Sequence, residues 1–151
     1  MKSYLTHLQC TKCEEIFSSD EVHQTCPACG KVLYARYNLN GATQDLTKSI
    51  LKNRASNMWR YFEVMPIKKE ANIISLGEGF TPLLKAANLG KNIGCSNLYI
   101  KDEGANPTGS FKDRGLSAAI SKAKELGEEK FSIPSAGNAA SSMAAYCAKG
   151  G

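Results

Sequence analysis

The chain has 151 residues, of which 42% are hydrophobic and 22% charged, and its net charge is +5 at pH 7. A chain of this length can hold one domain, or a small module followed by part of a larger domain. The sequence has no run of eighteen apolar residues and no signal peptide, so we expect a cytoplasmic protein without membrane contacts. Its lysines and arginines are scattered along the chain, which argues against a nucleic-acid partner.

Four of the six cysteines form two Cys-x-x-Cys pairs near the N-terminus. Cys10 and Cys13 are separated by twelve residues from Cys26 and Cys29, and the second pair lies in a Cys-Pro-Ala-Cys-Gly turn. Four thiolates with this spacing can surround one ion tetrahedrally, which suits zinc and leaves no open coordination position. We therefore predict a zinc ribbon over residues 1–37, in which Zn²⁺ has a structural role. An iron site and a redox-active dithiol are the alternatives.

Residues 38–72 are expected to form a linker and a helical segment. The stretch Asn38–Asp45 is polar and contains glycine, which favours a linker. The segment Leu46–Phe62 is expected to form one helix or a helix pair that ends before Pro66. We expect Trp59 to pack in the core or between domains and not to serve as a stacking platform.

From Ile73 onward, the sequence pattern alternates between strands and helices. It predicts strands at Ile73–Leu76, Leu98–Lys101 and Lys130–Pro134, and helices at Ser110–Leu126 and Asn138–Lys149. Alternation of this kind implies parallel strands with right-handed crossovers, and therefore an α/β fold class. Ligands of such sheets bind at the carboxyl ends of the strands.

The turn before the first of these helices places one lysine at a helix start. Pro107 and Gly109 favour a tight turn, and Ser110 followed by Asp113 has the pattern of a helix capping box. Lys112 then lies in the first helical turn, where the positive end of the helix dipole favours a neutral amine. Imine chemistry requires a neutral amine. The alternative is an ordinary solvated lysine at the start of a helix.

Three segments of the sequence resemble, in order, the motifs of one enzyme family. The string Lys101-Asp-Glu-Gly-Ala-Asn-Pro-Thr-Gly-Ser-Phe-Lys-Asp-Arg-Gly115 is similar to the cofactor-lysine segment of threonine synthases, which are fold type II pyridoxal-phosphate enzymes. Ser75-Leu-Gly-Glu-Gly-Phe-Thr-Pro-Leu83 and Pro134-Ser-Ala-Gly-Asn-Ala-Ala140 resemble two further motifs of this family. The resemblance begins near Trp59 and is weaker over the N-terminal cysteines. It implies that residues 73–151 are part of a three-layer α/β/α lobe.

The resemblance also implies roles for individual residues. Lys112 would form the Schiff base with pyridoxal 5′-phosphate and would then transfer protons at the substrate carbons. Ser135, Gly137 and Asn138 would bind the substrate carboxylate through a turn with exposed N–H groups. Asn138 would also donate a hydrogen bond to the 3′-oxygen of the cofactor.

Two further residues are expected at the substrate pocket. Thr81 belongs to the Gly-Glu-Gly-Phe-Thr-Pro turn, which lies near that pocket in the family. Arg114 could bind a substrate phosphate, because guanidinium groups bind phosphate in a bidentate manner. The alternative for Arg114 is a solvated arginine on the first helical turn. Ala136 stands where many relatives have serine or threonine, so the substrate carboxylate would depend on backbone amides and Ser135.

The reaction that the resemblance implies is the conversion of O-phospho-L-homoserine and water to L-threonine and phosphate. Cysteate synthase and threonine or serine dehydratase share the fold and are alternatives, as is a non-catalytic zinc-ribbon binding module. The sequence lacks a second glycine-rich loop for the cofactor phosphate. We therefore expect an N-terminal fragment that is inactive alone and whose full-length form can be a homo-oligomer.

Overall fold

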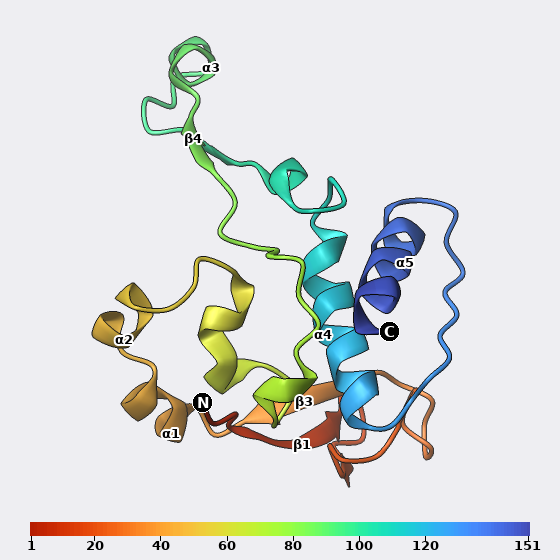
Figure 1. Ribbon diagram of the computed structural model, residues 1–151. Coiled ribbons are helices and arrows are strands. Elements are labelled where there is room, and N and C mark those ends of the chain that lie inside the picture. Colours follow the sequence, from red (N-terminus) through yellow and green to blue (C-terminus); the bar gives the residue numbers. More distant parts are fainter.

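The computed structural model describes residues 1–151 and has three parts (Figure 1). A three-stranded sheet forms the N-terminal part. Two long helices, α4 (Lys112–Glu125) and α5 (Asn138–Gly150), lie beside it, and an arm formed by residues 82–102 extends away from both. Short helices between residues 39 and 72 connect the sheet to the rest of the chain.

The N-terminal sheet has the strand order β2-β1-β3, and both pairings are antiparallel. Its strands are β1 (Leu5–Cys10), β2 (Ile16–Phe17) and β3 (Leu33–Tyr37). The register places Cys10 opposite Leu33. Each Cys-x-x-Cys turn is followed by a residue in the left-handed region, Glu14 with φ 62° and Gly30 with φ 68°. The region predicted as a ribbon thus contains short strands, and the same backbone turn closes both cysteine pairs.

Residues 38–45 form helix α1 (Leu39–Asp45), although we expected a linker there. Asn38 caps this helix, because its Oδ1 atom accepts a 3.0 Å hydrogen bond from the N–H of Gly41. The polar residues that suggested a linker are compatible with a helix that lies on the surface, where only Ala42 is buried. A polar composition therefore did not distinguish a loop from a short surface helix in this segment.

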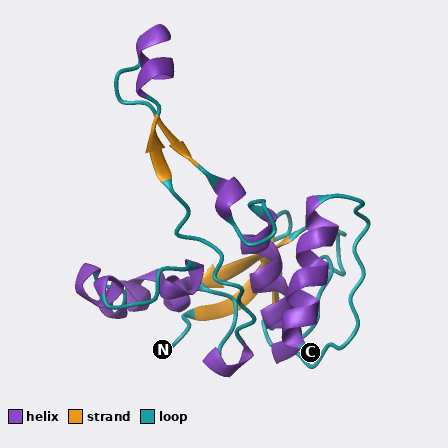
Figure 2. Ribbon diagram, turned by 45° about the horizontal axis from the view of Figure 1, so that its top comes forward, coloured by secondary structure: helices purple, strands orange, loops and turns teal.

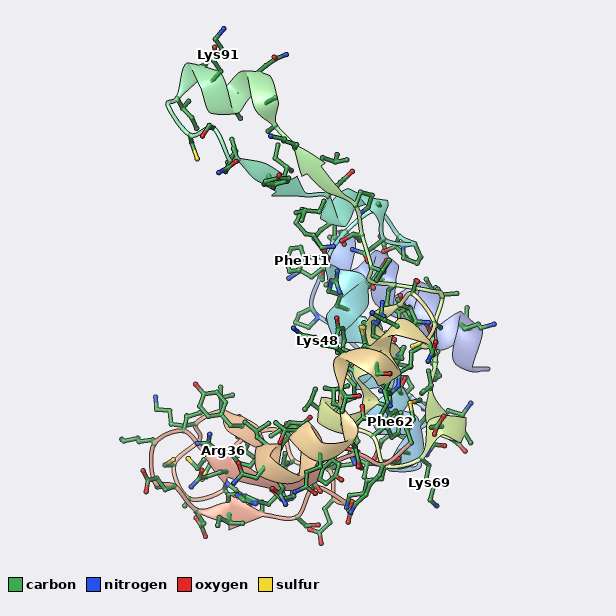
Figure 3. The ribbon with its side chains drawn as sticks, turned by 90° about the vertical axis from the view of Figure 1, so that its left-hand side faces the viewer. Arg36, Lys48, Phe62, Lys69, Lys91 and Phe111 are labelled. Atoms are coloured by element: carbon green, nitrogen blue, oxygen red, sulfur yellow. The ribbon has the colours of Figure 1, made fainter.

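The helical segment expected over residues 46–62 is a helix pair. It consists of α2 (Lys48–Lys52) and the 3-10 helix η1 (Met58–Val64). Trp59 packs in the core, as predicted. Its buried cluster also contains Met58, Phe62 and Ile67. Phe62, which Figure 3 labels, is fully buried, so η1 is held mainly by apolar packing.

Helices α4 and α5 lie side by side and run in the same direction (Figure 1). Near their N-terminal ends, Ser142 Oγ donates a 2.6 Å hydrogen bond to Asp113 Oδ1. Near their C-terminal ends, Lys124 Nζ donates a 3.1 Å hydrogen bond to the carbonyl of Gly150. Both helices were predicted to within two residues at each end. Neither these two helices nor any other helix is long and apolar enough to span a membrane.

The expected parallel strands are not present. The strands of the arm, β4 (Leu83–Lys85) and β5 (Tyr99–Lys101), pair with each other in antiparallel fashion on either side of α3 (Ala87–Asn92). Figure 2 shows this two-stranded sheet apart from the N-terminal sheet. The prediction of a strand at residues 98–101 is therefore confirmed, whereas its predicted parallel neighbours are not.

Residues 73–76 and 130–134 were predicted as strands but belong to no sheet. Serine side chains of α4 bind the backbone of the first segment in place of a neighbouring strand. Ser121 Oγ accepts a 2.8 Å hydrogen bond from the N–H of Ile74, and Ser117 Oγ lies 2.8 Å from the carbonyl oxygen of the same residue. Because α4 lies against this backbone and satisfies the N–H of Ile74, the segment needs no strand partner there.

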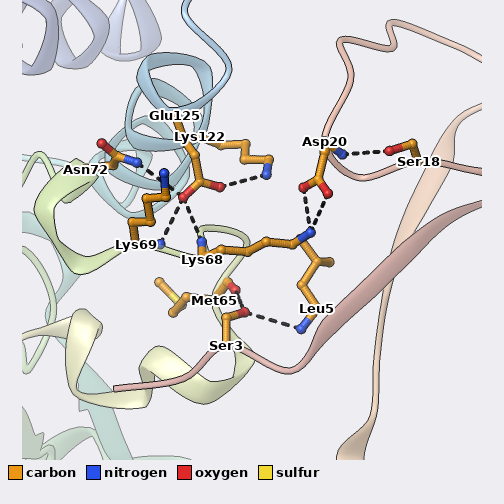
Figure 4. Close-up of polar contacts among 10 residues, drawn as sticks. All are labelled: Ser3, Leu5, Ser18, Asp20, Met65, Lys68, Lys69, Asn72, Lys122 and Glu125. Carbon is orange, nitrogen blue, oxygen red and sulfur yellow. Dashed lines mark hydrogen bonds and ion pairs between the residues drawn. The ribbon is translucent and has the colours of Figure 1, made fainter.

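Polar contacts of Glu125 and Lys68 join three segments where the N-terminal sheet approaches the end of α4 (Figure 4). Glu125 accepts hydrogen bonds from the backbone N–H of Lys68, at 2.8 Å, and from Nζ of Lys122, at 2.9 Å. Burial would raise the pKa of Glu125, but Lys122 and the backbone donors lower it below its ordinary value. Lys68 Nζ in turn contacts Asp20 at 2.5 Å in the loop after β2. These contacts fix the start of η2 (Glu70–Asn72) between the sheet and α4.

Two glycines with nearly the same backbone conformation provide a test of the packing in loop 75–81. Gly77 has φ 94° and Gly79 has φ 90°, so alanine is strained at both positions. A Cβ atom at Gly77 would meet nothing within 4 Å, whereas one at Gly79 would lie 2.8 Å from the backbone nitrogen of Met58. Alanine therefore has a similar conformational cost at both positions, but only at Gly79 does it also clash with a neighbouring atom.

We predict that Gly77→Ala lowers the free energy of unfolding by about 1–2 kcal/mol, because of backbone strain alone. Gly79→Ala should cost a further 1–3 kcal/mol, roughly, because the loop must move away from η1. Urea unfolding of both variants in the full-length protein measures the difference. Equal destabilisation by the two substitutions would contradict the close contact between loop 75–81 and η1.

Candidate functional site

The N-terminal ends of α4 and α5 bring together the residues that the sequence analysis singled out. Lys112 is the first residue of α4, and Asn138 is the first residue of α5. The hydrogen bond between Asp113 and Ser142 joins the two helices close to these ends. Because the helices are parallel, the positive ends of both helix dipoles face the same region. This region is suited to a ligand that carries negative charge.

Lys112 is half-buried and forms no hydrogen bond or ion pair through its amine. Its Nζ atom lies 4.7 Å from the ring centroid of the exposed Phe111. Its backbone N–H donates a 3.3 Å hydrogen bond to Ser110 Oγ, which fixes the start of the helix. The lysine amine is therefore free to bind a ligand, and Figure 3 shows its neighbour in sequence, Phe111, where the arm joins the helices.

The helix start differs in detail from the predicted capping box. The helix begins at Lys112 and not at Ser110, and Phe111 occupies the cap position with helical φ and ψ. Asp113 does not bind the N–H of Ser110. Its fully buried carboxylate instead accepts hydrogen bonds from the backbone N–H of Thr108, at 2.7 Å, and from Thr108 Oγ1, at 2.5 Å. Asp113 therefore fixes the turn that precedes Lys112 and, through Ser142, connects this turn to α5.

The turn before α5 presents backbone donors to the same region. Ser135 Oγ accepts a 3.3 Å hydrogen bond from the N–H of Gly137, which shapes the turn. Gly137 occupies the N-cap position and has no side chain to cap the helix. The N–H groups of Asn138, Ala139 and Ala140 have no hydrogen-bond partner. An anion placed there would satisfy them.

Arg114 and Thr81 lie together in a third part of the site, where both bind Glu103 of the 3-10 helix η3 (Glu103–Ala105). Arg114 Nε and Nη2 donate to the two carboxylate oxygens at 2.6 and 2.7 Å. Thr81 Oγ1 donates to the same carboxylate at 2.6 Å. Hydrogen bonds from Arg114 and then from Thr81 lower the pKa of Glu103 to about 2. The third guanidinium nitrogen of Arg114, Nη1, donates no hydrogen bond to Glu103.

Asn106 fixes the position of this group relative to loop 75–81. Its buried side chain accepts a 3.0 Å hydrogen bond from the N–H of Gly79 and donates a 2.8 Å bond to the carbonyl of Glu103. The turn that leads to Lys112 is thus connected to the loop that carries Thr81.

Glu78, which we did not predict as a residue of the site, is fully buried in the same loop. Its carboxylate accepts five hydrogen bonds, from Trp59 Nε1, Ser75 Oγ, the N–H of Leu76, Ser117 Oγ and the hydroxyl of Tyr146. Burial and the bond to Glu78 raise the pKa of Tyr146, so its hydroxyl remains protonated and can donate. A sequence signal did exist: serines on the inner faces of the two predicted helices indicate a buried polar partner.

The four paired cysteines converge at the end of the N-terminal sheet. The Sγ atoms of Cys10, Cys13, Cys26 and Cys29 all lie within 4.8 Å of one another. The distances are 3.4 Å from Cys10 to Cys29, 3.6 Å from Cys13 to Cys26 and 3.7 Å from Cys13 to Cys29. No disulfide is present, since all six cysteines are free. Burial would raise the pKa of Cys10, but the N–H groups of Cys13 and Lys12 lower it to about 6.

These residues fit the metal and the cofactor that the sequence suggested. Four thiolates bound to one zinc ion at ~2.3 Å lie about 3.8 Å apart, which is close to the sulfur distances of the cluster. The free amine of Lys112 is the nucleophile that an aldehyde cofactor requires from a protein, and the unpaired N–H groups at the start of α5 are donors suited to a carboxylate bound beside it.

We predict that the ion pair between Glu103 and Arg114 makes the free energy of unfolding depend on pH in the acid range. The folded pKa of Glu103 is about 2, below the value of about 4.3 for an unfolded chain. Its contribution is therefore complete above about pH 5 and is lost as the pH falls towards 2. Both side chains are partly exposed, so we expect a modest effect.

Urea unfolding at several pH values tests this prediction with Glu103→Gln. The variant should lose less stability than the wild type between about pH 5 and pH 2. Glu129→Gln is the matched control, because Glu129 is exposed and has no partner. If Glu103→Gln kept the full acid dependence of the wild type, the ion pair would not contribute to stability.

Comparison with known proteins assigns the chain to a family. The family described as "Pyridoxal-phosphate dependent enzyme" matches residues 74–151. Threonine synthase of Methanocaldococcus jannaschii is 43% identical over 143 residues, which are 95% of this chain and 35% of that protein. Threonine synthase of Methanosarcina acetivorans is 40% identical over 96% of this chain and 35% of its own length. A threonine synthase of Bacillus sp. is 48% identical over 90 residues, 60% of this chain and 25% of that protein.

The chain therefore spans about a third of the length of the two archaeal relatives. Their alignments cover nearly all of it, including most of the N-terminal sheet, whereas the family match begins at residue 74. That match includes both helices of the candidate site, together with Lys112 and Asn138. Because it covers more than half of the 151 residues, the chain belongs to the family of pyridoxal-phosphate dependent enzymes.

Proposed function

We propose that the protein carrying this chain is a threonine synthase, which converts O-phospho-L-homoserine and water to L-threonine and phosphate. The observation that supports this most directly is the placement of Lys112 and of the unpaired N–H groups of α5 at neighbouring ends of two parallel helices. The two archaeal relatives that align with nearly the whole chain are both named threonine synthase.

In this proposal, Lys112 has two roles. Its amine binds pyridoxal phosphate covalently, and it later moves protons at Cα and Cβ of the substrate. When bound, the cofactor supplies an electron sink for the carbanion character that develops at these carbons. The amine is suited to both roles because no protein group competes for it, and because Ser110 and Asp113 fix the start of its helix.

Ser135, Gly137 and Asn138 form the second part of the proposed site. The N–H groups at the start of α5 would donate to the substrate carboxylate, and the helix dipole would favour its negative charge. Ser135 shapes this turn through its bond from Gly137. The side chain of Asn138 is exposed at the first position of α5, where it could donate to an oxygen of the cofactor ring.

Thr81 and Arg114 are proposed to line the substrate side of the site. Their side chains are already fixed by Glu103, so they would meet the substrate without losing further conformational freedom. Arg114 can approach a phosphate with Nη1, the nitrogen that Glu103 does not use. A bidentate phosphate contact through Nη1 and Nη2 would compete with the 3.3 Å contact of Nη2 to Thr81 Oγ1, so we propose a single contact through Nη1.

We further propose that Cys10, Cys13, Cys26 and Cys29 bind one structural zinc ion. Two features support this assignment. The sulfur atoms of the cluster lie within 4.8 Å of one another, and each cysteine pair is followed by one residue in the left-handed region. Four sulfur ligands would leave no position for a substrate, so the ion would stabilise the N-terminal sheet and take no part in the reaction.

The first prediction of this proposal concerns Lys112 in the full-length protein. Borohydride reduction should fix the cofactor to Lys112, as peptide mass spectrometry would show. Lys112→Ala should lower turnover of O-phospho-L-homoserine by at least about a hundredfold, because the covalent link and the proton transfer are both lost. Lys101→Ala is the control, since Lys101 donates to the carbonyl of Thr81 and lies on the arm. Labelling of Lys101 in place of Lys112 would refute the assignment.

The second prediction concerns the metal. Purified protein should contain one zinc ion per chain, and Cys26→Ser should lose it, because Cys26 is a buried ligand in the second pair. Cys95→Ser should keep the ion, since Cys95 is exposed and outside the cluster. Elemental analysis of the wild type, Cys26→Ser and Cys95→Ser measures the zinc content of each protein. Equal zinc contents in the wild type and Cys26→Ser would rule out the proposed ligand set.

A further inference from the structure

We propose that Glu78 is a positioning residue of the site: its buried carboxylate sets the placement of α4 relative to α5, and thereby the placement of Lys112 relative to the turn before Asn138. This inference rests on the proposed function, because it assumes that the two helix ends bind the cofactor and the substrate. It concerns a residue that touches neither of them.

The carboxylate of Glu78 has no cationic partner. It is fully buried, and it takes part in no ion pair. Burial of an unpaired charge is costly unless hydrogen bonds replace the lost water. In this loop five donors replace it, at distances between 2.5 and 3.1 Å. The position of each donor is therefore constrained by the need to satisfy one anion.

The donors come from four segments of the chain. Trp59 lies on η1, and Ser75 and Leu76 lie in the loop of Glu78 itself. Ser117 lies on α4, five residues after Lys112, and Tyr146 lies on α5, eight residues after Asn138. Through Ser117 and Tyr146, Glu78 therefore connects the two helices about one to two turns below the ends that carry the site.

The two carboxylate oxygens differ in their partners, but each faces one N–H group that can only donate. Oε1 accepts from Trp59 Nε1 at 2.8 Å, and Oε2 accepts from the N–H of Leu76 at 2.9 Å. A glutamine at this position would turn its own NH₂ group towards one of these N–H groups in either orientation. Two donors would then face each other in a buried site, which costs stability. Glu78→Gln is isosteric but is expected to disrupt the network.

Replacement of Trp59 by phenylalanine removes this conflict. In Glu78→Gln/Trp59→Phe, the glutamine NH₂ can occupy the Oε1 side and donate to Ser117 Oγ. Ser117, whose single proton goes to Glu78 Oε1 in the wild type, can then donate that proton to the carbonyl of Ile74, which lies 2.8 Å away. The glutamine oxygen can then accept from Leu76 and Tyr146, as Oε2 does in the wild type. The second substitution should therefore rescue the first.

Asp113 provides a matched comparison, because it is also a fully buried carboxylate without a cation. Its Oδ2 atom faces the N–H of Thr108, whereas Oδ1 accepts only from the hydroxyls of Thr108 and Ser142. Hydroxyl groups can rotate and accept. Asp113→Asn can therefore place its NH₂ on the hydroxyl side, and it should lower the melting temperature less than Glu78→Gln does.

The experiment measures melting temperature and the Kd of pyridoxal phosphate for the full-length wild type, Glu78→Gln, Trp59→Phe and the double variant. Ile67→Ala is the control for general destabilisation, since Ile67 is fully buried in the η1 cluster and binds no part of the network. We expect Glu78→Gln to weaken cofactor binding by at least about tenfold. In the Trp59→Phe background, the same substitution should change the Kd by less than about threefold, and Ile67→Ala should lower the melting temperature without changing the Kd.

Two results would overturn the inference. One is a Glu78→Gln protein that melts at a lower temperature but binds the cofactor as tightly as the wild type, as Ile67→Ala should. The other is an equal effect of Glu78→Gln on melting temperature in both backgrounds, which would show that Trp59 and Glu78 are not coupled. A wild type that binds no cofactor would instead refute the proposed function, and the coupling in melting temperature would still decide whether Glu78 and Trp59 belong to one hydrogen-bond network.

Discussion

The buried carboxylate of Glu78 is the constraint on which the rest of the structure depends. A buried carboxylate that forms no ion pair must be surrounded by donors, and four segments supply them. This need explains a tryptophan on η1, a serine on α4 and a tyrosine on α5 that all face one point. It also explains why Gly77 and Gly79 flank Glu78: both have positive φ, which allows the loop to turn sharply and to pass close to η1.

The site follows from this arrangement of helices. Parallel helices bring two positive dipole ends together, a geometry suited to a negatively charged ligand. Asp113 connects the same helices nearer to the site and also fixes the turn before Lys112. Two buried carboxylates thus hold the region in which the lysine amine and the backbone donors of α5 remain free. Glu103 has the corresponding role for Arg114 and Thr81.

Local signals in the sequence were sufficient for the features that depend on neighbouring residues. The spacing of the cysteine pairs predicted a ribbon over residues 1–37, where the structure has the N-terminal sheet, and the Pro107–Gly109 turn predicted that Lys112 lies at the start of a helix, although two residues inside it. The prediction of strands at residues 73–76 and 130–134 was wrong, because a strand forms only with a partner segment. Residues 73–76 contact serines of α4 in place of such a partner. Glu78 was missed for a related reason: its burial depends on helices that lie up to 68 residues away in sequence.

The most direct test of the proposed site is a crystal structure of the full-length protein with pyridoxal phosphate bound. We predict that the cofactor is linked to Nζ of Lys112 and lies against the N–H groups at the start of α5, while the Glu78 carboxylate keeps its bonds to Trp59, Ser117 and Tyr146. A cofactor bound to another lysine or away from the two helix ends would contradict the proposed site. A solvent-exposed Glu78 in that structure would show that a buried anion does not determine how the two helices are arranged.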